Sequence, residues 1–428
     1  MNVQKGQSVY FIGMGGIGMS ALAQLYHVRG VAVSGCDREP SVTTKLLSEK
    51  GISVYVGQCA NNIPPRVDLV VYSDAVPFDN AERALLRERG IPEQSYFEAL
   101  GDVSRDFFTI AVAGSHGKTT TTALVGKMLQ DQGVNPTVIV GSIVTDFGSN
   151  FLQGEPSGPL VVEACEYKDH LLKLSPQMLV VTNVEWDHTD YFKTFEQLKE
   201  TFKTAVQRLP ENGTLVVNMK TPMGAWLASH SPCRVVDYST LSVPRLNLLG
   251  EFNAYNARAA KATALAYKDF PEAALDVSLS QFKGTWRRFE YKGVAPGGAE
   301  VYDDYAHHPT EVKTTLEAMR EKFPTKKIIV AFHPHLYSRT RDLMEEFSHA
   351  FGAADAVIVA PIYAAREEPI PGVTSEALVQ RIQKEERKAV AALSLEDTFV
   401  LLKKFDQPDT VLITMGAGDI YKVAERLL

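Results

Sequence analysis

Cysteine is scarce in this sequence, and the four that occur lie far apart, at Cys36, Cys59, Cys165 and Cys233. None of them belongs to a CxxC pair. The pattern argues against a disulfide framework or a zinc site and indicates reduced thiols in a cytosolic protein. Long apolar runs are absent too, since no stretch approaches the roughly 20 apolar residues that a membrane-spanning helix needs.

An excess of basic residues is also lacking, because 44 lysines and arginines face 51 aspartates and glutamates, giving a formal net charge of −7. This balance argues against a nucleic-acid partner, whose phosphates the protein would have to neutralise. The first residues, MNVQKGQSVYFIG, contain no basic region followed by a long apolar stretch, so no secretory signal is expected. We therefore expect a cytoplasmic protein that does not insert into a membrane.

The sequence does contain a repeated alternation of short apolar runs and helical patterns, which is typical of parallel, doubly wound sheets. The alternation starts three times within 428 residues, and this length suits two or three domains of roughly 100–200 residues each. The predicted fold class is α/β with three domains. Rossmann-like sheets are expected over residues 1–106 and 287–428, and a parallel-rich sheet over 107–286.

The first apolar run, SVYFIG, leads into a glycine-rich turn that opens a helical pattern. Gly13, Gly15, Gly16 and Gly18 fit G-x-G-x-x-G, in which glycines permit a tight turn and the helix N-terminus offers free N–H groups to a diphosphate. Asp37 ends the next apolar run, where an acid that contacts a ribose is expected. The alternative is tight strand–helix packing without a ligand. We favour a nucleotide or nucleotide-sugar site.

A second glycine-rich turn, GSHGKTT, follows a later apolar run. Backbone N–H groups of such a P-loop cradle phosphates, while Lys118 reaches the β- and γ-phosphates and Thr119 gives its hydroxyl to Mg²⁺. Val112 stands where the usual G-x-x-x-x-G-K-[ST] pattern has its first glycine, so the loop is a shortened variant. The alternative is a helix start with a solvated lysine. The predicted nucleotide-binding residues are Gly114, Ser115, His116, Gly117, Lys118, Thr119 and Thr120.

Two more strand ends follow this loop in the same predicted sheet. Glu163 ends PLVVE, and His188 follows MLVVTN. Because ligands gather at the carboxyl ends of parallel strands, both side chains are expected to face Thr119. A carboxylate suits Mg²⁺, which prefers oxygen ligands, whereas an imidazole is a less natural ligand. Three neighbouring acids are equally compatible with helix caps or solvated charges, namely Glu166, Asp187 and Asp190.

Polar clusters also follow two strands of the last segment. DDYAHHPTE and HPHLYSRTR come at adjacent strand ends and predict a site for a small polar substrate. A two-histidine metal site is the competing interpretation, but the consecutive His307 and His308 cannot face the same way on a regular element. Earlier in the chain, Asn253 and Asn256 begin an alanine-rich helix, either as caps or as adenine contacts.

Taken in chain order, these motifs resemble those of the Mur ligase family, the ATP-dependent amino-acid ligases of peptidoglycan synthesis. The resemblance covers essentially the whole chain and rests on GSHGKTTTT, VVEACE, TNVEWDHTDYF, GEFNAYNARAA, GTWRRFE and DDYAHHPTE. GMGGIGMSALA, DDYAHHPTEV and HPHLYSRTRDL are most similar to the members that add L-alanine. The resemblance implies UDP-N-acetylmuramate and L-alanine as substrates, ATP and Mg²⁺ as cofactors, and amide formation through an acyl phosphate.

The resemblance also implies a role for each matching residue. The first domain would hold the UDP sugar, the central domain ATP, and the last domain the amino acid. The metal ligands would be Thr119, Glu163 and His188. The ATP site would add Asn253, Arg287, Arg288 and Asp304, and alanine would be held by Tyr305, His307, His335 and Arg339. The catalytic set would be Lys118, Glu163, His188, His307 and Arg339, with His307 as the base for the alanine ammonium.

Departures from the family pattern leave the specificity open. The chain has Cys165-Glu166-Tyr167-Lys168 where the alanine-adding members often read D-E-S-D. Leu336 stands where some members place an arginine, and Phe252 replaces a histidine that often precedes the helix asparagine. A sister Mur ligase that adds a preformed peptide in murein recycling, or another amino acid, is therefore the alternative.

Two other classes of protein explain only part of the sequence. A P-loop regulatory protein would account for the second glycine-rich loop alone, and a dinucleotide-dependent oxidoreductase for the first alone. Monomer and dimer are both compatible with the sequence. Lys199 and Lys203 lie where a carbamylated lysine of the central domain could occur.

Overall fold

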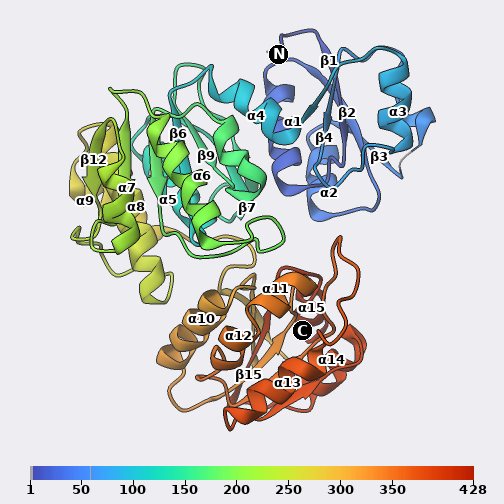
Figure 1. Ribbon diagram of the computed structural model, residues 1–428, viewed down its shortest axis with the longest axis vertical. Helices are drawn as coiled ribbons and strands as arrows, with labels where there is room; N and C mark the ends of the chain where they lie inside the picture. Colours follow the sequence, from blue (N-terminus) through green and yellow to red (C-terminus); the bar gives the residue numbers. More distant parts are fainter. Residues whose placement is uncertain (1–2, 58) are drawn as a thin grey trace. The chain divides into compact units, whose positions relative to one another are not determined.

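The computed structural model describes residues 3–57 and 59–428 and contains three parallel-rich sheets (Figure 1). The chain forms two compact units. The first unit comprises Met1–Val184, Lys199–Arg245 and Tyr255–Lys283, and the second comprises Glu185–Leu198, Leu246–Ala254 and Gly284–Leu428. Two short stretches from the middle of the chain therefore belong to the second unit.

The first sheet has the strand order β3-β2-β1-β4-β5, and all its strands are parallel. The order reverses between β1 and β4, so right-handed crossovers place α1 and α3 on opposite faces (Figure 1). This is the predicted Rossmann-like arrangement. Its elements are β1 (Ser8–Ile12), α1 (Ile17–Val28), β2 (Ala32–Asp37), α2 (Val42–Glu49), β3 (Ser53–Val56), η1 (Ala60–Asn62), β4 (Leu69–Tyr72), α3 (Ala81–Glu88), β5 (Glu93–Ser95) and α4 (Tyr96–Ser104).

The second sheet has the order β12-β11-β10-β6-β9-β7-β8 and is parallel except for the hairpin of β7 and β8. Its central strand β6 runs directly into the P-loop, and β10 and β9 flank it on either side. Its elements are β6 (Thr109–Ala113), α5 (Lys118–Asp131), β7 (Thr137–Val144), β8 (Ser149–Leu152), β9 (Leu160–Glu163), η2 (Tyr167–Lys173), β10 (Met178–Val181), α6 (Phe195–Gln207), β11 (Thr214–Val217), α7 (Pro222–Ser229), β12 (Arg234–Asp237), α8 (Glu251–Tyr267) and α9 (Glu272–Gln281).

The third sheet has the order β13-β14-β18-β15-β16-β17 and is parallel except for β13. The polar clusters predicted at adjacent strand ends follow β14 and β15, which lie on either side of β18. Its elements are β13 (Glu290–Val294), β14 (Glu300–Asp304), α10 (Pro309–Lys322), β15 (Lys327–Phe332), α11 (Tyr337–Asp342), α12 (Met344–His349), β16 (Ala356–Val359), α13 (Ser375–Lys384), β17 (Ala389–Ala391), α14 (Leu395–Lys403), β18 (Thr410–Met415) and α15 (Tyr421–Arg426).

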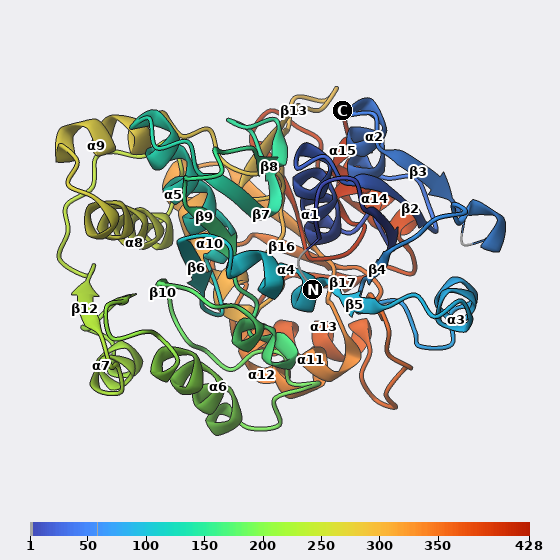
Figure 2. The same ribbon diagram turned by 90° about the horizontal axis from the view of Figure 1, so that it is seen from above.

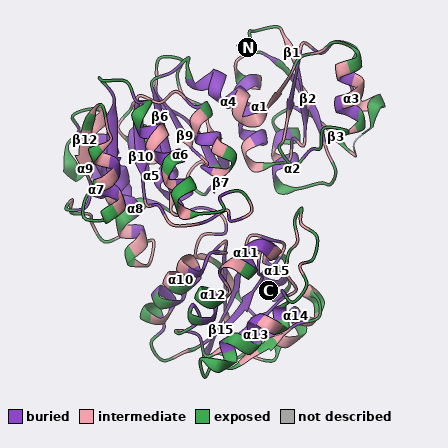
Figure 3. Cartoon of the chain, viewed as in Figure 1, coloured by how far each residue is buried: buried purple, intermediate pink, exposed green. Residues whose placement is uncertain are grey.

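The central strands are buried along most of their length, while the helices expose one side (Figure 3). Continuous apolar runs such as β10 and β18 are buried at every position, as expected for parallel strands covered on both faces. The predicted α/β class with three sheets is confirmed. Among the described residues, no helix combines the length and apolarity needed to cross a membrane.

Within the first unit, α1 packs against the hairpin of β7 and β8 (Figure 2). A buried network of polar side chains lies at this contact. The side-chain amide of Asn150 donates to Ser20 Oγ at 2.8 Å and to the carbonyl of Ile17. Gln24 Nε2 donates back to Asn150 Oδ1 at 3.1 Å. Because every member of the network has a partner, it fixes the glycine-loop helix relative to the central sheet.

We expect Asn150→Ala to destabilise the first unit, because it removes the hydrogen bonds that the Asn150 amide makes with Ser20, with the Ile17 carbonyl and with Gln24. The expected loss in the free energy of unfolding is about 1–3 kcal/mol, measured by urea denaturation. Lys45→Ala, which removes an exposed side chain of α2, is the control and should change that free energy by less than about 0.5 kcal/mol. Equal effects of the two variants would contradict the assigned network.

Candidate active site

The P-loop is built by two glycines whose backbone other residues rarely adopt. Gly114 has φ +131°, and Gly117 has φ +80° in the left-handed region as the N-cap of α5. A Cβ on Gly117 would lie 2.1 Å from the side-chain oxygen of Asn256, so this asparagine packs directly on the loop. All four consecutive threonines, Thr119 to Thr122, are buried. The loop therefore has the compact turn that the sequence predicted.

Lys118 folds back over its own loop. Its ammonium donates to the carbonyls of Gly114 and Ser115 and lies 3.1 Å from the Glu166 carboxylate. Burial alone would lower the pKa of Lys118, but the carboxylates of Glu166 and Glu163 outweigh burial and raise that pKa to about 12. The ammonium is therefore charged at neutral pH and ready for an anion. Glu166 is fully buried in this pair and is not the solvated acid that the sequence left possible.

Glu163 connects the end of β9 to the P-loop. Thr119 Oγ1 donates to its Oε1 at 3.1 Å, and the backbone N–H of Gly141 donates to its Oε2 at 2.8 Å. Thr119 and Glu163, two of the three predicted metal ligands, are thus brought together. Their donor atoms are both oxygens, which is the donor set that Mg²⁺ prefers.

The first glycine-rich loop is held by Asp37. Gly15 N donates to Asp37 Oδ2 at 2.8 Å, and a Cβ on Gly15 would meet the same oxygen at 2.8 Å. Gly13 has φ +82°, and a Cβ on Gly18 would lie 2.6 Å from the ring of Tyr96. Gly16 is the N-cap of α1, with no side chain over the helix end. Gly13, Gly15 and Gly18 are therefore required by backbone conformation or close approach, which agrees with the predicted tight turn.

A cavity of the first unit, with a volume of about 260 Å³, lies beside the first glycine-rich loop. The N-terminus of α1 lines one part of it, and Glu163 at the end of β9 lines another. The full lining is Gly16, Ile17, Gly18, Met19, Ser73, Asp74, Tyr96, Phe97, Ile139, Val140, Gly141, Glu163 and Cys165. The P-loop does not line the cavity itself but is connected to it through Glu163, which accepts the hydrogen bond of Thr119.

His170 contacts two of the residues that line this cavity. Its Nε2 lies 2.6 Å from Asp74 Oδ2, and its ring stacks on Phe97 with centroids 3.6 Å apart. Tyr167, one of the departures from the family pattern, contacts the same ring edge-on at 6.0 Å. Cys165, another departure, lines the cavity. No sequence pattern pointed to His170, because its two partners, Asp74 and Phe97, come from the first segment of the chain.

Arg287 and Arg288 begin the third sheet and differ in their surroundings. Arg287 is buried and donates to Asp303 Oδ2 at 2.8 Å, to Gly418 O at 3.0 Å and to Gly416 O at 2.6 Å. It therefore holds the loop that follows β18. Arg288 is more exposed, with its guanidinium 5.0 Å from the Tyr305 ring centre.

Asp304 ends β14 as a buried carboxylate. It accepts hydrogen bonds from the backbone N–H groups of Phe289 at 2.6 Å and Ala306 at 2.7 Å. Burial raises the pKa of Asp304 to about 6, although Arg288 and these two amides oppose the change. The acid is therefore largely ionised at neutral pH and fixes the turns on both sides of it.

Three rings form the predicted amino-acid region. His307 lies edge-on to Tyr305 at 5.2 Å and to His335 at 5.9 Å. Burial lowers the pKa of His307 to about 4 and that of His335 to about 2, so both rings are neutral at pH 7. His307 Nδ1 lies 3.0 Å from the carbonyl of Tyr305, which only accepts. The proton is therefore on Nδ1, and the lone pair of Nε2 is left to accept a proton.

Arg339 is buried against Asp187. Its Nε and Nη2 donate to Asp187 Oδ1 at 2.9 and 2.6 Å, and its Nη1 donates to His335 Nδ1 at 2.9 Å. Burial alone would raise the pKa of Asp187, but Arg339 and the nearby histidines hold it well below its usual range. Asp187 is therefore a paired buried charge. Asp190, on the same stretch, pairs with the more exposed Arg366 at 2.7 Å.

The remaining predicted residues lie in different units. His188, in the left-handed region at φ 53°, belongs to the second unit, whereas Thr119 and Glu163 belong to the first. Asn253 Nδ2 donates to the carbonyl of Leu249 at 2.7 Å and also lies in the second unit. Of the two lysines considered for carbamylation, Lys199 lies 4.9 Å from the Trp226 ring centre and Lys203 pairs with Glu200.

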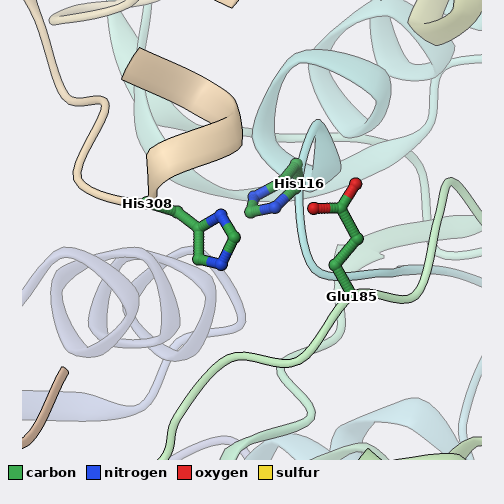
Figure 4. A group of neighbouring side chains, drawn as sticks. All are labelled: His116, Glu185 and His308. Atoms are coloured by element: carbon green, nitrogen blue, oxygen red, sulfur yellow. The ribbon is translucent and has the colours of Figure 1, made fainter. Parts of the chain in front are cut away.

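Figure 4 draws Glu185 and His308 of the second unit together with His116 of the P-loop. Glu185 accepts from Thr310 Oγ1 at 2.7 Å, and His308 Nε2 donates to the Trp186 carbonyl at 3.3 Å. His308 Nδ1 accepts from the Thr310 N–H as the N-cap of α10. Both ring nitrogens of His308 are thus engaged, which disfavours the paired-histidine metal site.

Comparisons with known proteins agree with this architecture. Models of the "Mur ligase family, catalytic domain", the "Mur ligase middle domain" and the "Mur ligase, glutamate ligase domain" match residues 8–108, 112–244 and 287–418. A curated relative, the UDP-N-acetylmuramate–L-alanine ligase of Clostridium acetobutylicum, is 37% identical over 99% of this chain and 97% of its own length.

Solved structures show the same fold. The UDP-N-acetylmuramate–alanine ligase of Thermotoga maritima has a TM-score of 0.82 at 26% identity and covers 98% of each chain. A murein peptide ligase from Psychrobacter arcticus has a TM-score of 0.75 at 20% identity, covers 99% of this chain and 98% of its own, and supports the fold alone. With three family models in chain order and a relative 37% identical over nearly the whole length, the chain belongs to the Mur ligase family.

Proposed function

We propose that the chain is an ATP-dependent ligase that joins L-alanine to the lactyl carboxylate of UDP-N-acetylmuramate, in the synthesis of peptidoglycan precursors. The observation that carries the proposal is the cavity of the first unit beside the first glycine-rich loop. It is lined by the open N-terminus of α1 and by Glu163, whose carboxylate contacts Thr119 of the P-loop. The proposed reaction requires the nucleotide sugar and the phosphates of ATP to bind next to each other. The names of the relatives supply the identity of the sugar and the amino acid.

The two nucleotides are assigned to the two loops. The diphosphate of the UDP sugar would bind the N-terminus of α1, where backbone N–H groups are free to face an anion. Its proposed contacts are Gly13, Gly15, Gly16, Gly18 and Asp37. ATP would bind the P-loop residues 114–120 with Asn253, Arg288 and Asp304, while Arg287 supports the site through its bonds to Gly416 and Gly418. Lys118 supplies the positive charge for the β- and γ-phosphates.

The reaction needs an activated carboxylate, because direct amide formation would expel oxide. A lactyl carboxylate oxygen attacks the γ-phosphorus of ATP, the bond to the ADP oxygen breaks, and an acyl phosphate forms. The alanine amine then attacks the acyl carbon, and inorganic phosphate leaves with the carboxylate oxygen. Phosphoryl transfer of this kind depends on positioning and charge stabilisation, which is the work of Lys118 and the loop amides.

A Mg²⁺ ion fits the oxygen donors at this end of the sheet. Thr119 and Glu163 would hold it, and His188 is the third ligand that the family resemblance implies. When bound, the ion neutralises phosphate charge. The 3.1 Å hydrogen bond between Thr119 and Glu163 supports the assignment, because it keeps the two oxygen atoms that would bind the metal close together.

Alanine arrives as an ammonium and has to lose a proton before it attacks. His307 is the proposed base, since its ring is neutral and its Nδ1–H bond to Tyr305 O leaves Nε2 able to accept a proton. Tyr305 and His335 would line the same region, with Arg339 behind them. We further propose that residues 1–106, 107–286 and 287–428 are domains for the sugar nucleotide, ATP and the amino acid, and that the enzyme works in the cytoplasm, where both nucleotides occur.

A sister activity, the addition of a preformed peptide, is the second candidate. One observation favours it: Leu336, where some alanine-adding members place an arginine, is buried at the N-terminus of α11 and offers no charge to an alanine carboxylate. Tyr167 and Lys168 also differ from the usual pattern beside the cavity. We rank this candidate second because curated relatives that are 37% identical over nearly the whole chain are named for L-alanine.

ADP release in the presence of UDP-N-acetylmuramate separates the two candidates. We expect L-alanine to stimulate release more than other amino acids or an L-alanyl-γ-D-glutamyl tripeptide. A coupled assay across such a panel measures this directly. Strong stimulation by the tripeptide alone would establish the sister activity, and no stimulation by any acceptor would refute the ligase proposal.

Lys118→Ala should lower kcat by roughly 100-fold or more, because the phosphates lose their main positive partner. UDP-N-acetylmuramate binding, followed by calorimetry, should stay within about threefold of the unmodified enzyme. Lys127→Ala, which removes a side chain of the same helix that pairs with Asp131, is the matched control and should keep near-normal turnover. Near-normal turnover in Lys118→Ala would show that the phosphate assignment is wrong.

Glu163→Gln should raise the Mg²⁺ concentration needed for half-maximal rate. Losing one charged oxygen ligand is worth about 1.5–3 kcal/mol, which corresponds to roughly a ten- to hundredfold change. The measurement is a Mg²⁺ titration of ADP release at saturating substrates, with the exposed Glu155→Gln as the control. An unchanged titration curve in Glu163→Gln would place the metal elsewhere.

A further inference from the structure

The stretch that carries His188 has an unusual position in the fold. It follows β10 of the central sheet, yet Glu185–Leu198 belongs to the second unit, with the amino-acid region. Trp186 packs against the apolar core formed by the third sheet and its helices. The stretch is therefore held by contacts within the second unit, although it continues from a strand of the first.

One buried ion pair lies at the centre of these contacts. Asp187 and Arg339 are 5% and 2% exposed, and two nitrogens of the guanidinium donate to the same carboxylate oxygen. Asp187 Oδ1 also accepts the backbone N–H of His188 at 2.6 Å. The pair therefore fixes the backbone at the residue next to it, where His188 has its left-handed conformation.

Weaker contacts flank the pair on both sides. Glu185 accepts from Thr310 Oγ1, and the Trp186 carbonyl accepts from His308 Nε2. Further along, Asp190 pairs with Arg366, whose side chain is 52% exposed. An exposed pair of this kind contributes little, whereas breaking a buried pair leaves an uncompensated charge away from water. Asp187 and Arg339 therefore form the contact on which the stretch depends.

The same guanidinium also fixes the state of His335. Arg339 Nη1 can only donate, so His335 Nδ1 must accept and the ring proton must lie on Nε2. Three of the five N–H donors of Arg339 are then engaged by Asp187 and His335. This arrangement differs from the direct contact with the alanine carboxylate that the family resemblance implies.

We propose that Asp187 and Arg339 are positioning residues that fasten the His188 stretch to the amino-acid unit and present His335 as its Nε2–H tautomer. The proposal rests on the ligase function proposed above. Its consequence is that the histidine assigned to the metal and the rings assigned to alanine belong to one rigid piece. Arg339 then acts through Asp187 and His335 and not as the anchor of the alanine carboxylate.

The test compares Asp187→Asn, Arg339→Gln and the double variant with the control Asp190→Asn. Amide hydrogen exchange over residues 185–192 is measured without substrates, so this arm does not depend on activity. We expect at least about tenfold faster exchange in both single variants and less than about threefold in the control. In the double variant both charges of the pair are removed, so neither is left unpaired. This variant tests whether the fold is retained without the pair. An unchanged exchange rate in Asp187→Asn would overturn the proposal that Asp187 fastens the His188 stretch to the amino-acid unit.

Steady-state kinetics then distinguish positioning from direct binding. At saturating ATP and UDP-N-acetylmuramate, positioning predicts that both single variants lower kcat by a similar factor, about tenfold or more, with an unchanged KM for ATP. The double variant should be no worse than the poorer single one. A large rise of the alanine KM in Arg339→Gln, with normal kinetics in Asp187→Asn, would overturn the proposal in favour of carboxylate binding. A wild-type chain without alanine-dependent ADP release would refute the ligase function and leave the exchange result standing.

Discussion

Every site described above depends on one constraint, which is that the carboxyl ends of neighbouring parallel strands lie at the same edge of a sheet. In the central sheet β6 and β9 are neighbours, and this brings Thr119 within 3.1 Å of Glu163 although 44 positions separate them. In the third sheet β14, β18 and β15 are neighbours, so the loops that begin after Asp304, Met415 and Phe332 emerge together. The two antiparallel strands, β8 and β13, lie at sheet edges and leave these loops undisturbed.

Buried charges then fix the loops at those edges. Lys118 with Glu166, Arg287 with Asp303 and Arg339 with Asp187 are each paired away from water, where an unpaired charge would be costly. The first pair keeps the P-loop ammonium charged, the second holds the turn after β18, and the third holds the His188 stretch. A phosphate that binds Lys118 must compete with the carbonyls of Gly114 and Ser115 and with Glu166.

The fold class, the two glycine-rich turns and the meeting of Thr119 with Glu163 could all be predicted from the sequence, because each follows from local pattern and strand order. The pairings could not. Asp187 and Arg339 are 152 positions apart, and nothing local separates a buried acid from a solvated one. His170 was missed for the same reason, since Asp74 and Phe97 reach it only after the first two sheets pack. The motif predicted that Arg287 contacts the nucleotide. In the structure its guanidinium donates instead to protein carbonyls, those of Gly416 and Gly418.

The central claim is that one cavity brings the nucleotide-sugar carboxylate to the γ-phosphate of ATP and that the carboxylate is activated as an acyl phosphate. Transfer of oxygen-18 tests it most directly. UDP-N-acetylmuramate labelled in its lactyl carboxylate is turned over with ATP and L-alanine, and the released inorganic phosphate is analysed by mass spectrometry. The account predicts one labelled oxygen in each phosphate formed. Phosphate free of label, with both labelled oxygens accounted for elsewhere, would contradict it.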